Sequence, residues 1–200
     1  MQKRFAKLLI NYANKLKYAA MTINGICINI GCGGDIRPGW INCDFVPISD
    51  KVKKFNITSL DDLAWLSETH SELIECNHVI GYLNYIQALN FFKASFKSLD
   101  KRGKLILEFP DILKISKQLI EIDLLSVNID RYIELIRGVY AYDHVDAFDE
   151  SFNMQTYIFG WAGELVSSIL LDIGFSQVHI KSPKTHDRRE WRDTRIEAIK

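Results

Sequence analysis

The sequence has no excess of charge of either sign. Lys and Arg together number 25, Asp and Glu together also number 25, and the formal net charge at pH 7 is zero. A chain without a net field has no general attraction for nucleic acid or other polyanions. We therefore expect no nucleic-acid partner.

Cysteine is scarce and is not arranged as a metal-binding pattern. No C-x-x-C pair occurs, and the four cysteines lie in or beside apolar stretches, at Cys27, Cys32, Cys43 and Cys76. A structural zinc site needs clustered ligands at short spacing, so we expect no metal. Buried, reduced thiols are typical of a cytosolic chain, and we expect the protein to be cytoplasmic.

Long apolar runs are missing as well. No run reaches the roughly 18 residues that span a bilayer, and the first residues lack the continuous apolar core of a signal peptide. Residues 2–20 instead repeat apolar side chains every three or four positions and contain no acid, which predicts an amphipathic helix within 1–24. Such a basic helix either packs on the domain or makes a weak membrane-surface contact.

The chain does contain short apolar segments that alternate with helical ones. The apolar segments predict strands over 25–30, 40–46, 52–57, 72–80 and 104–110, and the periodic segments predict helices over 58–69, 84–99 and 161–174. This alternation favours a doubly wound, mostly parallel α/β sheet. Two closing strands, 176–182 and 194–200, are joined by a connection short enough for a hairpin, so we expect about seven strands with an antiparallel C-terminal pair.

Two parts of the chain depart from that alternation. Only residues 31–39 separate the first two strands, which leaves room for one helical turn at most. Residues 111–158 contain two helical stretches and a loop rich in aromatic and acidic residues. Because long loops in compact domains often cover substrate sites, we interpret 111–158 as an insertion within a single domain over 25–200.

A glycine-rich turn follows the first strand, and an acid ends the second, in the stretch INIGCGGDIRPGWINCD (28–44). Gly31, Gly33 and Gly34 let a ligand approach the backbone closely because no Cβ intervenes. Ligands of open α/β sheets bind at the carboxyl ends of strands, where Asp44 is placed to accept hydrogen bonds from a ribose diol. The stretch indicates a nucleoside site.

A nicotinamide dinucleotide fits this stretch less well. Its fingerprint is G-x-G-x-x-G followed by a helix whose N-terminus binds the pyrophosphate. Here Ile36 stands in place of the third glycine, and Pro38 and Gly39 prevent a long helix. An NAD-dependent oxidoreductase is therefore only a distant third hypothesis.

The motifs resemble those of small class I S-adenosylmethionine-dependent methyltransferases of the type 11-like group. The glycine stretch is similar to L-N-L-G-C-G followed by G-W-I-N-x-D. ELIECNHVIGYL is similar to D-L-I-x-x-x-H-V-L-E-H-L, and LDKRGKLILEFPD to R-P-G-G-x-L-x-L-x-x-P-D. FGWAGELVSSILLDIGFSQVHI and TRIEAIK resemble the family's closing helix and last two strands. Many such enzymes act in polysaccharide biosynthesis.

The resemblance covers about residues 25–200 and implies a Rossmann-like class I methyltransferase fold with S-adenosyl-L-methionine as cofactor. It implies a small molecule or glycan precursor as acceptor, with O-methylation favoured. The cofactor-binding residues that it implies are Gly31, Cys32, Gly33, Asp44, Asn56, Ile57 and Asn77. The backbone of the glycine turn would contact the methionine part, Asp44 the ribose, and residues 56–57 the adenine.

Methyl transfer to a hydroxyl benefits from a base. His78, near the exit of the fourth strand, is the first candidate. His144 is the second, with Asp143 or Asp146 as an orienting partner. The aromatic residues that would line an acceptor pocket are Tyr82, Tyr142, Tyr157 and Trp161. The charged run 184–193 is either a solvated hairpin or an anion-binding edge.

Two departures from the family pattern keep a second function open. Asn56 stands where the family often has an acid, and Gly81-Tyr82 stands where it usually has Glu-His. The chain is therefore either an active methyltransferase or a non-catalytic protein of the same fold that serves as a binding protein or a partner subunit.

Overall fold

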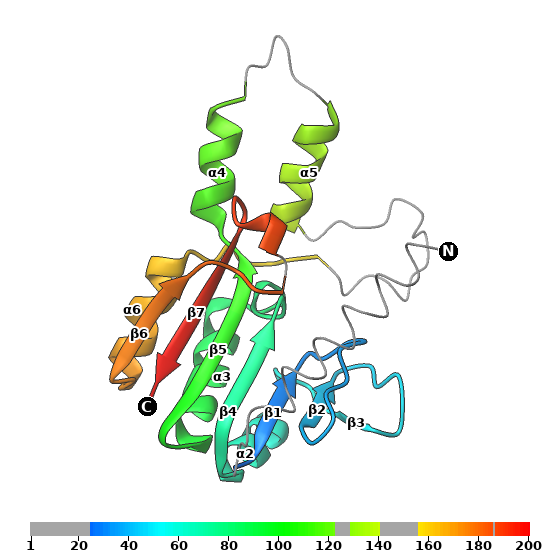
Figure 1. Ribbon diagram of the computed structural model, residues 1–200, viewed down its shortest axis with the longest axis vertical. Helices are drawn as coiled ribbons and strands as arrows, with labels where there is room; N and C mark the ends of the chain where they lie inside the picture. The colour runs from blue at the N-terminus through cyan, green and yellow to red at the C-terminus, as the bar shows by residue number, and fades with distance from the viewer. Residues whose placement is uncertain (1–24, 123–128, 141–155, 186) are drawn as a thin grey trace.

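The computed structural model describes residues 25–122, 129–140, 156–185 and 187–200. Seven strands form one sheet in the order β3-β2-β1-β4-β5-β7-β6 (Figure 1). They are β1 (Cys27–Ile30), β2 (Ile41–Asp44), β3 (Val52–Lys54), β4 (Ser71–Asn77), β5 (Leu99–Pro110), β6 (Gln177–Lys181) and β7 (Asp193–Ile199). The first five run parallel, and β7 pairs antiparallel with both β5 and β6. The predicted fold class is confirmed.

The helices within the described residues are α2 (Leu60–Glu68), α3 (Tyr85–Ser98), α4 (Ile112–Ile120), α5 (Ile129–Tyr140) and α6 (Gly163–Ile173). Two short 3₁₀ helices are η1 (Ile80–Tyr82) and η3 (Asp187–Arg189). None of these helices is long and apolar enough to cross a membrane. The helix predicted within 1–24 lies outside the described residues.

Local sequence signals set the helix ends. Ser59 caps α2, and Asn84 with Gln87 forms a reciprocal capping box at the start of α3. Asp111 caps α4, and Gly174, at φ +120°, ends α6 as expected. These short-range hydrogen bonds explain why the helix starts were readable from the sequence.

Three predicted strand boundaries were wrong. The third strand ends at Lys54 rather than at residue 57. The fourth strand ends at Asn77 rather than at residue 80, because His78 takes a left-handed φ of +57° and the chain then enters η1. The fifth strand begins at Leu99, directly after α3, rather than at residue 104. Ser71 pairs with Leu99, so residues 100–103 belong to β5 rather than to a connection between the helix and the strand.

The two faces of the sheet differ in composition. Alternate residues such as Ile28, Ile74 and Leu105 join the sheet-facing residues of α2, α3 and α6 in one main apolar core. The residues between them on the strands point to the opposite face. Several of these are polar yet buried, namely Asn29, Asn42, Glu75, Glu108, Arg195 and Glu197.

The carboxyl ends of β1, β2, β4 and β5 lie at one edge of the sheet. Figure 1 shows α4 and α5 projecting beyond that edge, above the end of β5. The segment 156–162 returns from them past η1 toward α6, and its Ile158 amide donates a hydrogen bond to the Gly81 carbonyl at 2.9 Å. The described parts of segment 111–158 thus border the carboxyl edge, where ligands of such sheets bind.

Candidate functional site

The glycine turn begins with a residue that must be glycine. Gly31 has a φ of +68°, and a Cβ there would lie 2.1 Å from Cγ2 of Val79. Both facts exclude a side chain at this position. The turn is therefore pressed against the segment that leaves β4, which brings the exits of two neighbouring strands together.

The amides of the turn are only partly available to a ligand. The backbone N–H groups of Gly31 and Cys32 both donate to the Cys43 carbonyl, at 2.8 and 3.0 Å. Among the residues that the structure describes, a Cβ built on Gly33 or Gly34 would meet no atom within 4 Å, so these residues leave space open at the second half of the turn. A ligand would approach there.

Asp44 lies beside that open space. Its Oδ2 accepts the Gly33 N–H at 2.8 Å, and its Oδ1 accepts the Val46 N–H at 3.0 Å. A carboxylate has about four lone-pair sites, so it can still accept two hydroxyl hydrogen bonds. An oriented carboxylate next to a bare backbone fits a nucleoside ribose.

Asn56 has a local role at the start of α2. Its side-chain oxygen accepts hydrogen bonds from the backbone N–H and the hydroxyl of Thr58, and its backbone N–H donates to the carboxylate of Asp62. Ile57 packs, partly buried, against the main core. Contact of these two residues with an adenine stays a prediction.

Polar side chains replace a helix in the link between β1 and β2. The Asn42 side chain accepts the Arg37 N–H and donates to the Arg37 carbonyl, both at 2.9 Å, and Asn29 donates to the Asp35 carbonyl at 2.8 Å. Residues 31–40 form turns without a helix. The link therefore has no helix N-terminus for a pyrophosphate, which weighs against the dinucleotide hypothesis.

A buried ion pair ties this link to β4. Arg37 donates to both carboxylate oxygens of Glu75, at 2.8 and 3.3 Å, and Asn77 donates to the same carboxylate at 2.8 Å. Burial by itself would raise the pKa of Glu75, but the Arg37 hydrogen bond and charge outweigh it and lower that pKa. Glu75 is therefore charged in the native state.

Asn77 and His78 stand at the exit of β4. The Asn77 Oδ1 is buried and accepts no hydrogen bond from the described residues. The His78 amide donates to the Glu108 carbonyl at 2.6 Å, and the side chain keeps 20% exposure. Its Nε2 lies 3.8 Å from Asp193 Oδ2 and 3.9 Å from Glu108 Oε1. An imidazole thus faces two buried carboxylates at the carboxyl edge.

Neither of those carboxylates was predicted from the sequence. Glu108 accepts the amides of Lys184 and Thr185 at 2.8 and 2.9 Å, and Asp193 pairs with both Nε and Nη2 of Arg192. Glu108 and Asp193 are fully buried. An acid inside the apolar run KLILEFP was a readable signal for Glu108, because a buried charge needs partners; Asp193 had no such signal.

The charged run 184–193 combines two environments. Residues 184, 185 and 188–190 are exposed, in keeping with a solvated hairpin, whereas Arg192 and Asp193 are buried. Two of its backbone amides bind Glu108 of this chain rather than an external anion. The run therefore holds the β6–β7 connection against β5.

Gly81 and Tyr157 explain one departure from the family pattern. A Cβ on Gly81 would lie 2.4 to 2.8 Å from ring atoms of Tyr157, so the tyrosine ring occupies the space of a side chain at position 81. Tyr82 packs on the same ring with centroids 4.8 Å apart. The Gly81-Tyr82 pair is thus part of an aromatic contact with a residue 75 or more positions later in the chain.

Trp161 closes the aromatic group from the core side. It is 1% exposed and donates through Nε1 to the Ile80 carbonyl at 2.8 Å. Its ring contacts those of Phe92 and Phe159. Tyr142 and His144 lie outside the described residues, so their predicted roles stay predictions.

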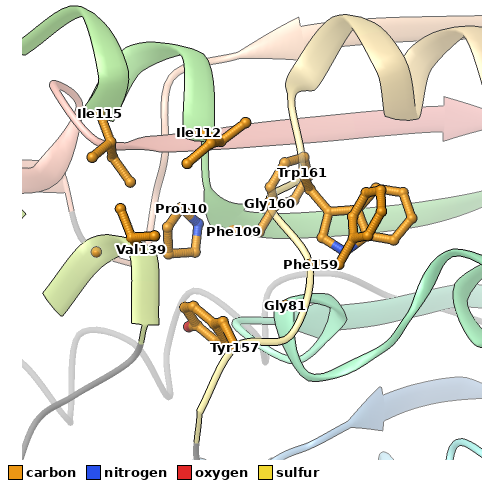
Figure 2. A pocket seen from close by; sticks show the side chains of 11 residues that line it. Gly81, Phe109, Pro110, Ile112, Ile115, Val139, Tyr157, Phe159, Gly160 and Trp161 are labelled. Atoms are coloured by element: carbon orange, nitrogen blue, oxygen red, sulfur yellow. The ribbon is translucent and has the colours of Figure 1, made fainter. Parts of the chain in front are cut away.

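An apolar hollow lies between this aromatic group and the two projecting helices (Figure 2). Its enclosed volume is about 10 Å³, room for about one water molecule, and the rest of the space is open to solvent. Figure 2 shows Tyr157 on the opposite side of it from Ile112 and Ile115. Its lining comprises Gly81, Phe109, Pro110, Ile112, Ile115, Gly138, Val139, Tyr157, Phe159, Gly160 and Trp161. Two of the four aromatic residues predicted from the sequence, Tyr157 and Trp161, belong to it.

The four cysteine thiols are buried and have raised pKa values. All four cysteines are unpaired and buried, as expected. Burial raises the pKa of Cys27 to about 11 and that of Cys43 to about 12, and it also raises those of Cys32 and Cys76. No cluster of potential metal ligands occurs among the described residues.

Comparison with known proteins gives a likeness of structure only. No protein-family model and no curated protein matches the sequence. A SAM-dependent methyltransferase from Archaeoglobus fulgidus superposes with a TM-score of 0.57 at 14% identity, over 96% of this chain and 93% of its own. A protein assigned as an S-adenosylmethionine-dependent methyltransferase from Listeria monocytogenes has the same TM-score and identity, over 94% and 99%.

A third solved structure, PigF with SAH, superposes with a TM-score of 0.51 at 13% identity; the match covers 98% of this chain and 56% of PigF. The strand order, the antiparallel last pair and these likenesses agree. The chain has the class I methyltransferase fold.

Proposed function

We propose that the protein is an S-adenosyl-L-methionine-dependent methyltransferase that acts on a hydroxyl group of a small molecule. The observation that carries this proposal is the pairing of the open Gly33–Gly34 turn with the Asp44 carboxylate at the edge of a class I methyltransferase sheet. An oriented carboxylate suits a ribose diol, and the bare turn suits an amino-acid tail that approaches the backbone. Structural neighbours described with SAM or SAH support the choice of nucleoside.

The cofactor would supply a sulfonium methyl group that needs no further activation. Asp44 would accept the ribose hydroxyls, and the backbone at Gly33 and Gly34 would lie against the methionine part. The main task of the protein is then to align an acceptor oxygen with that methyl group, an effect worth roughly 7–11 kcal/mol in well-oriented reactions.

His78 is the proposed base. Its buried Nε2 faces Asp193 and Glu108, so a proton on that nitrogen would be stabilised by both carboxylates. Nδ1 is then the nitrogen that accepts the acceptor's hydroxyl proton as the new C–O bond forms and the S–C bond breaks. General-base assistance of this kind contributes about 10²–10⁴-fold.

Calorimetry with S-adenosylhomocysteine tests the cofactor assignment. We expect Asp44→Ala to weaken binding about 10- to 100-fold, because hydrogen bonds to a charged group contribute about 1.5–3 kcal/mol. Asp44→Asn keeps an acceptor for the Gly33 amide and separates loss of charge from loss of the turn. Asp50→Ala, at an exposed position, is the matched control. Absence of binding by the folded wild-type protein would refute the proposal.

A non-catalytic binding protein of the same fold is the second candidate. It is favoured by one observation, the Tyr157 ring that fills the space beside Gly81 where the family usually has an acid. Radiolabelled methyl transfer to cell-extract small molecules separates the two. Binding of S-adenosylhomocysteine without any methyl transfer would favour this candidate. Methyl transfer that drops at least 100-fold in His78→Gln would favour the enzyme.

A further inference from the structure

The carboxylate of Asp193 lies between two side chains that can carry a positive charge. Its Oδ1 accepts the Nε–H of Arg192 at 2.6 Å, and its Oδ2 accepts an Nη2–H of the same guanidinium at 3.0 Å. The same Oδ2 lies 3.8 Å from Nε2 of His78. Asp193 is fully buried, and no other hydrogen bond to its carboxylate comes from the described residues. Within this part of the chain, Arg192 is therefore the cation that offsets Asp193 when the imidazole is uncharged.

The second carboxylate beside His78 is compensated by more groups. Glu108 accepts the two backbone N–H groups of residues 184 and 185, at 2.8 and 2.9 Å, and lies 3.4 Å from Nη1 of Arg195. The other buried acids of these strands are paired as well, Glu75 with Arg37 and Glu197 with Lys181 and Arg195. Loss of one side chain would leave Glu108 with hydrogen-bond donors, whereas Asp193 depends on a single arginine.

Arg192 is held in place by contacts that do not involve its charge. Its backbone N–H donates to the Arg189 carbonyl, and its carbonyl accepts the Asp111 N–H, both at 2.8 Å. A Cβ on Gly138 would lie 2.8 Å from Cδ of Arg192, so helix α5 lies against the stem of the side chain. Because that side chain is only 11% exposed, its guanidinium is fixed against Asp193.

A histidine acts as a base only while one of its ring nitrogens is unprotonated. Two buried carboxylates favour the cationic ring with a proton on both nitrogens, because opposite charges within about 4–6 Å stabilise each other. With an uncompensated Asp193, Nδ1 of His78 would hold a proton before the reaction and could not accept another. Arg192 opposes this effect, so the ring keeps one proton, on Nε2.

We propose that Arg192 is a positioning residue for the base: it fixes the Asp193 carboxylate beside His78 and offsets its charge, which keeps Nδ1 unprotonated before methyl transfer. This inference rests on the proposed function and adds the control of the proton on its base. As the hydroxyl oxygen bonds to the methyl carbon and the S–C bond breaks, the hydroxyl proton moves to Nδ1. The positive charge lost from the sulfonium sulfur is then held on the imidazole, beside Asp193 and Glu108.

A pH titration by NMR tests this assignment on the full-length protein with ¹⁵N-labelled histidine, and His78→Gln identifies the His78 signals among the five histidines. Arg192→Met should raise the midpoint of the His78 titration by about 1 pH unit or more, because Asp193 loses the cation that offsets it. Arg192→Lys keeps the charge and should stay within about 0.5 pH unit of the wild type. The matched control is Arg189→Met, which removes the same charge from an exposed position of the same connection and should shift the midpoint by less than about 0.2 pH unit.

Two further variants decide the test if Arg192→Met does not fold. Asp193→Asn removes the carboxylate and keeps Arg192, so the midpoint should fall by about 1 pH unit. The double variant Arg192→Met with Asp193→Asn buries no uncompensated charge, and its midpoint should lie at or below that of the wild type. The inference is overturned if Arg192→Met leaves the midpoint unchanged, if Arg189→Met raises it equally, or if Asp193→Asn does not lower it.

The pH dependence of methyl transfer gives a readout that a purely structural role of Arg192 would not change. In Arg192→Met, the rise of activity with pH should move to higher pH together with the His78 midpoint, so the loss should be large at neutral pH and smaller at high pH. A loss that is equal at every pH would show that Arg192 only supports the fold, and would overturn the inference.

The two proposals fail separately. A protein that binds S-adenosylhomocysteine, but whose His78 midpoint does not respond to Arg192→Met, keeps the proposed function and loses the role of Arg192. A protein that shows the shift of the midpoint but binds no S-adenosylhomocysteine loses the proposed function.

Discussion

The two faces of the sheet are built from the same strands but from opposite chemistry. In β4, Ile74 and Cys76 join the apolar core with the helices, whereas Glu75, between them, is buried on the other face in an ion pair. The same alternation repeats in β5, where Leu107 is apolar and Glu108 binds two amides and Arg195. One face excludes water through apolar area; the other buries charges only as paired groups.

The difference shows which face controls the site. The apolar core holds the helices to the sheet and does not determine which ligand binds. The polar face reaches the carboxyl edge through Arg37, Glu75 and Asn77 on one side and through Glu108 and Asp193 on the other. Because hydrogen bonds have fixed directions, these pairs orient the exits of β1, β4 and β5 and the start of β7 relative to one another.

The largest effect is expected on the apolar face. Phe92→Ala in α3 removes a fully buried ring that contacts Phe91 and Trp161. We expect a loss of about 3–5 kcal/mol in the free energy of unfolding, as for other buried Phe→Ala changes. Urea unfolding at pH 7 measures it, with the exposed Leu60→Ala as control. A loss below about 1 kcal/mol would mean that this face is not the main source of stability.

On the polar face, removing one partner should cost more than removing both. Arg37→Met leaves the buried Glu75 charge without its two shortest charged contacts, which we expect to cost about 3 kcal/mol. The double change Arg37→Met with Glu75→Leu should recover most of that loss, because no uncompensated charge stays buried. Urea unfolding of the single and double variants measures the coupling, and Lys101→Met at an exposed position is the control. Additive losses would show that the pair is not coupled.

The smallest effect concerns pH. Burial alone would raise the pKa of Glu197, but hydrogen bonds from Lys181 and Arg195 outweigh it and lower that pKa to about 2. Because the folded pKa lies below the unfolded value of about 4.3, Glu197 contributes stability above about pH 4.5, and that contribution is lost as the pH falls toward 2. Between these pH values, the free energy of unfolding should fall less in Glu197→Gln than in the wild type.

Unfolding in urea at several pH values from 2 to 6 checks this expectation. Glu75 also has a lowered pKa, so the free energy of unfolding of Glu197→Gln should still decrease to some extent as the pH falls. The exposed Glu68→Gln serves as the matched change. If the free energy of unfolding depends on pH in Glu197→Gln as it does in the wild type, the interaction of Glu197 with Lys181 and Arg195 is not a source of the acid sensitivity.

Much of the fold was open to prediction because its signals are local. Caps at Ser59 and Asn84, the stop at Gly174 and the strand–helix alternation each depend on hydrogen bonds or side-chain patterns within a few residues. The glycine turn and Asp44 were also readable, since they are thirteen positions apart or less in a single strand–turn–strand unit. The end of β4 was misjudged because the positive φ of His78 has no signature in its neighbours.

The sequence by itself determined the sheet, the helix ends and the glycine turn with its acid. Only the tertiary structure decided which distant residues meet at the site: His78 of the β4 exit beside Glu108 and Asp193, and Gly81 beneath the ring of Tyr157. Such contacts join residues 30 or more positions apart, and their geometry follows from strand order and register rather than from any local pattern. Burial gives these polar contacts their strength, and burial exists only once the chain has folded.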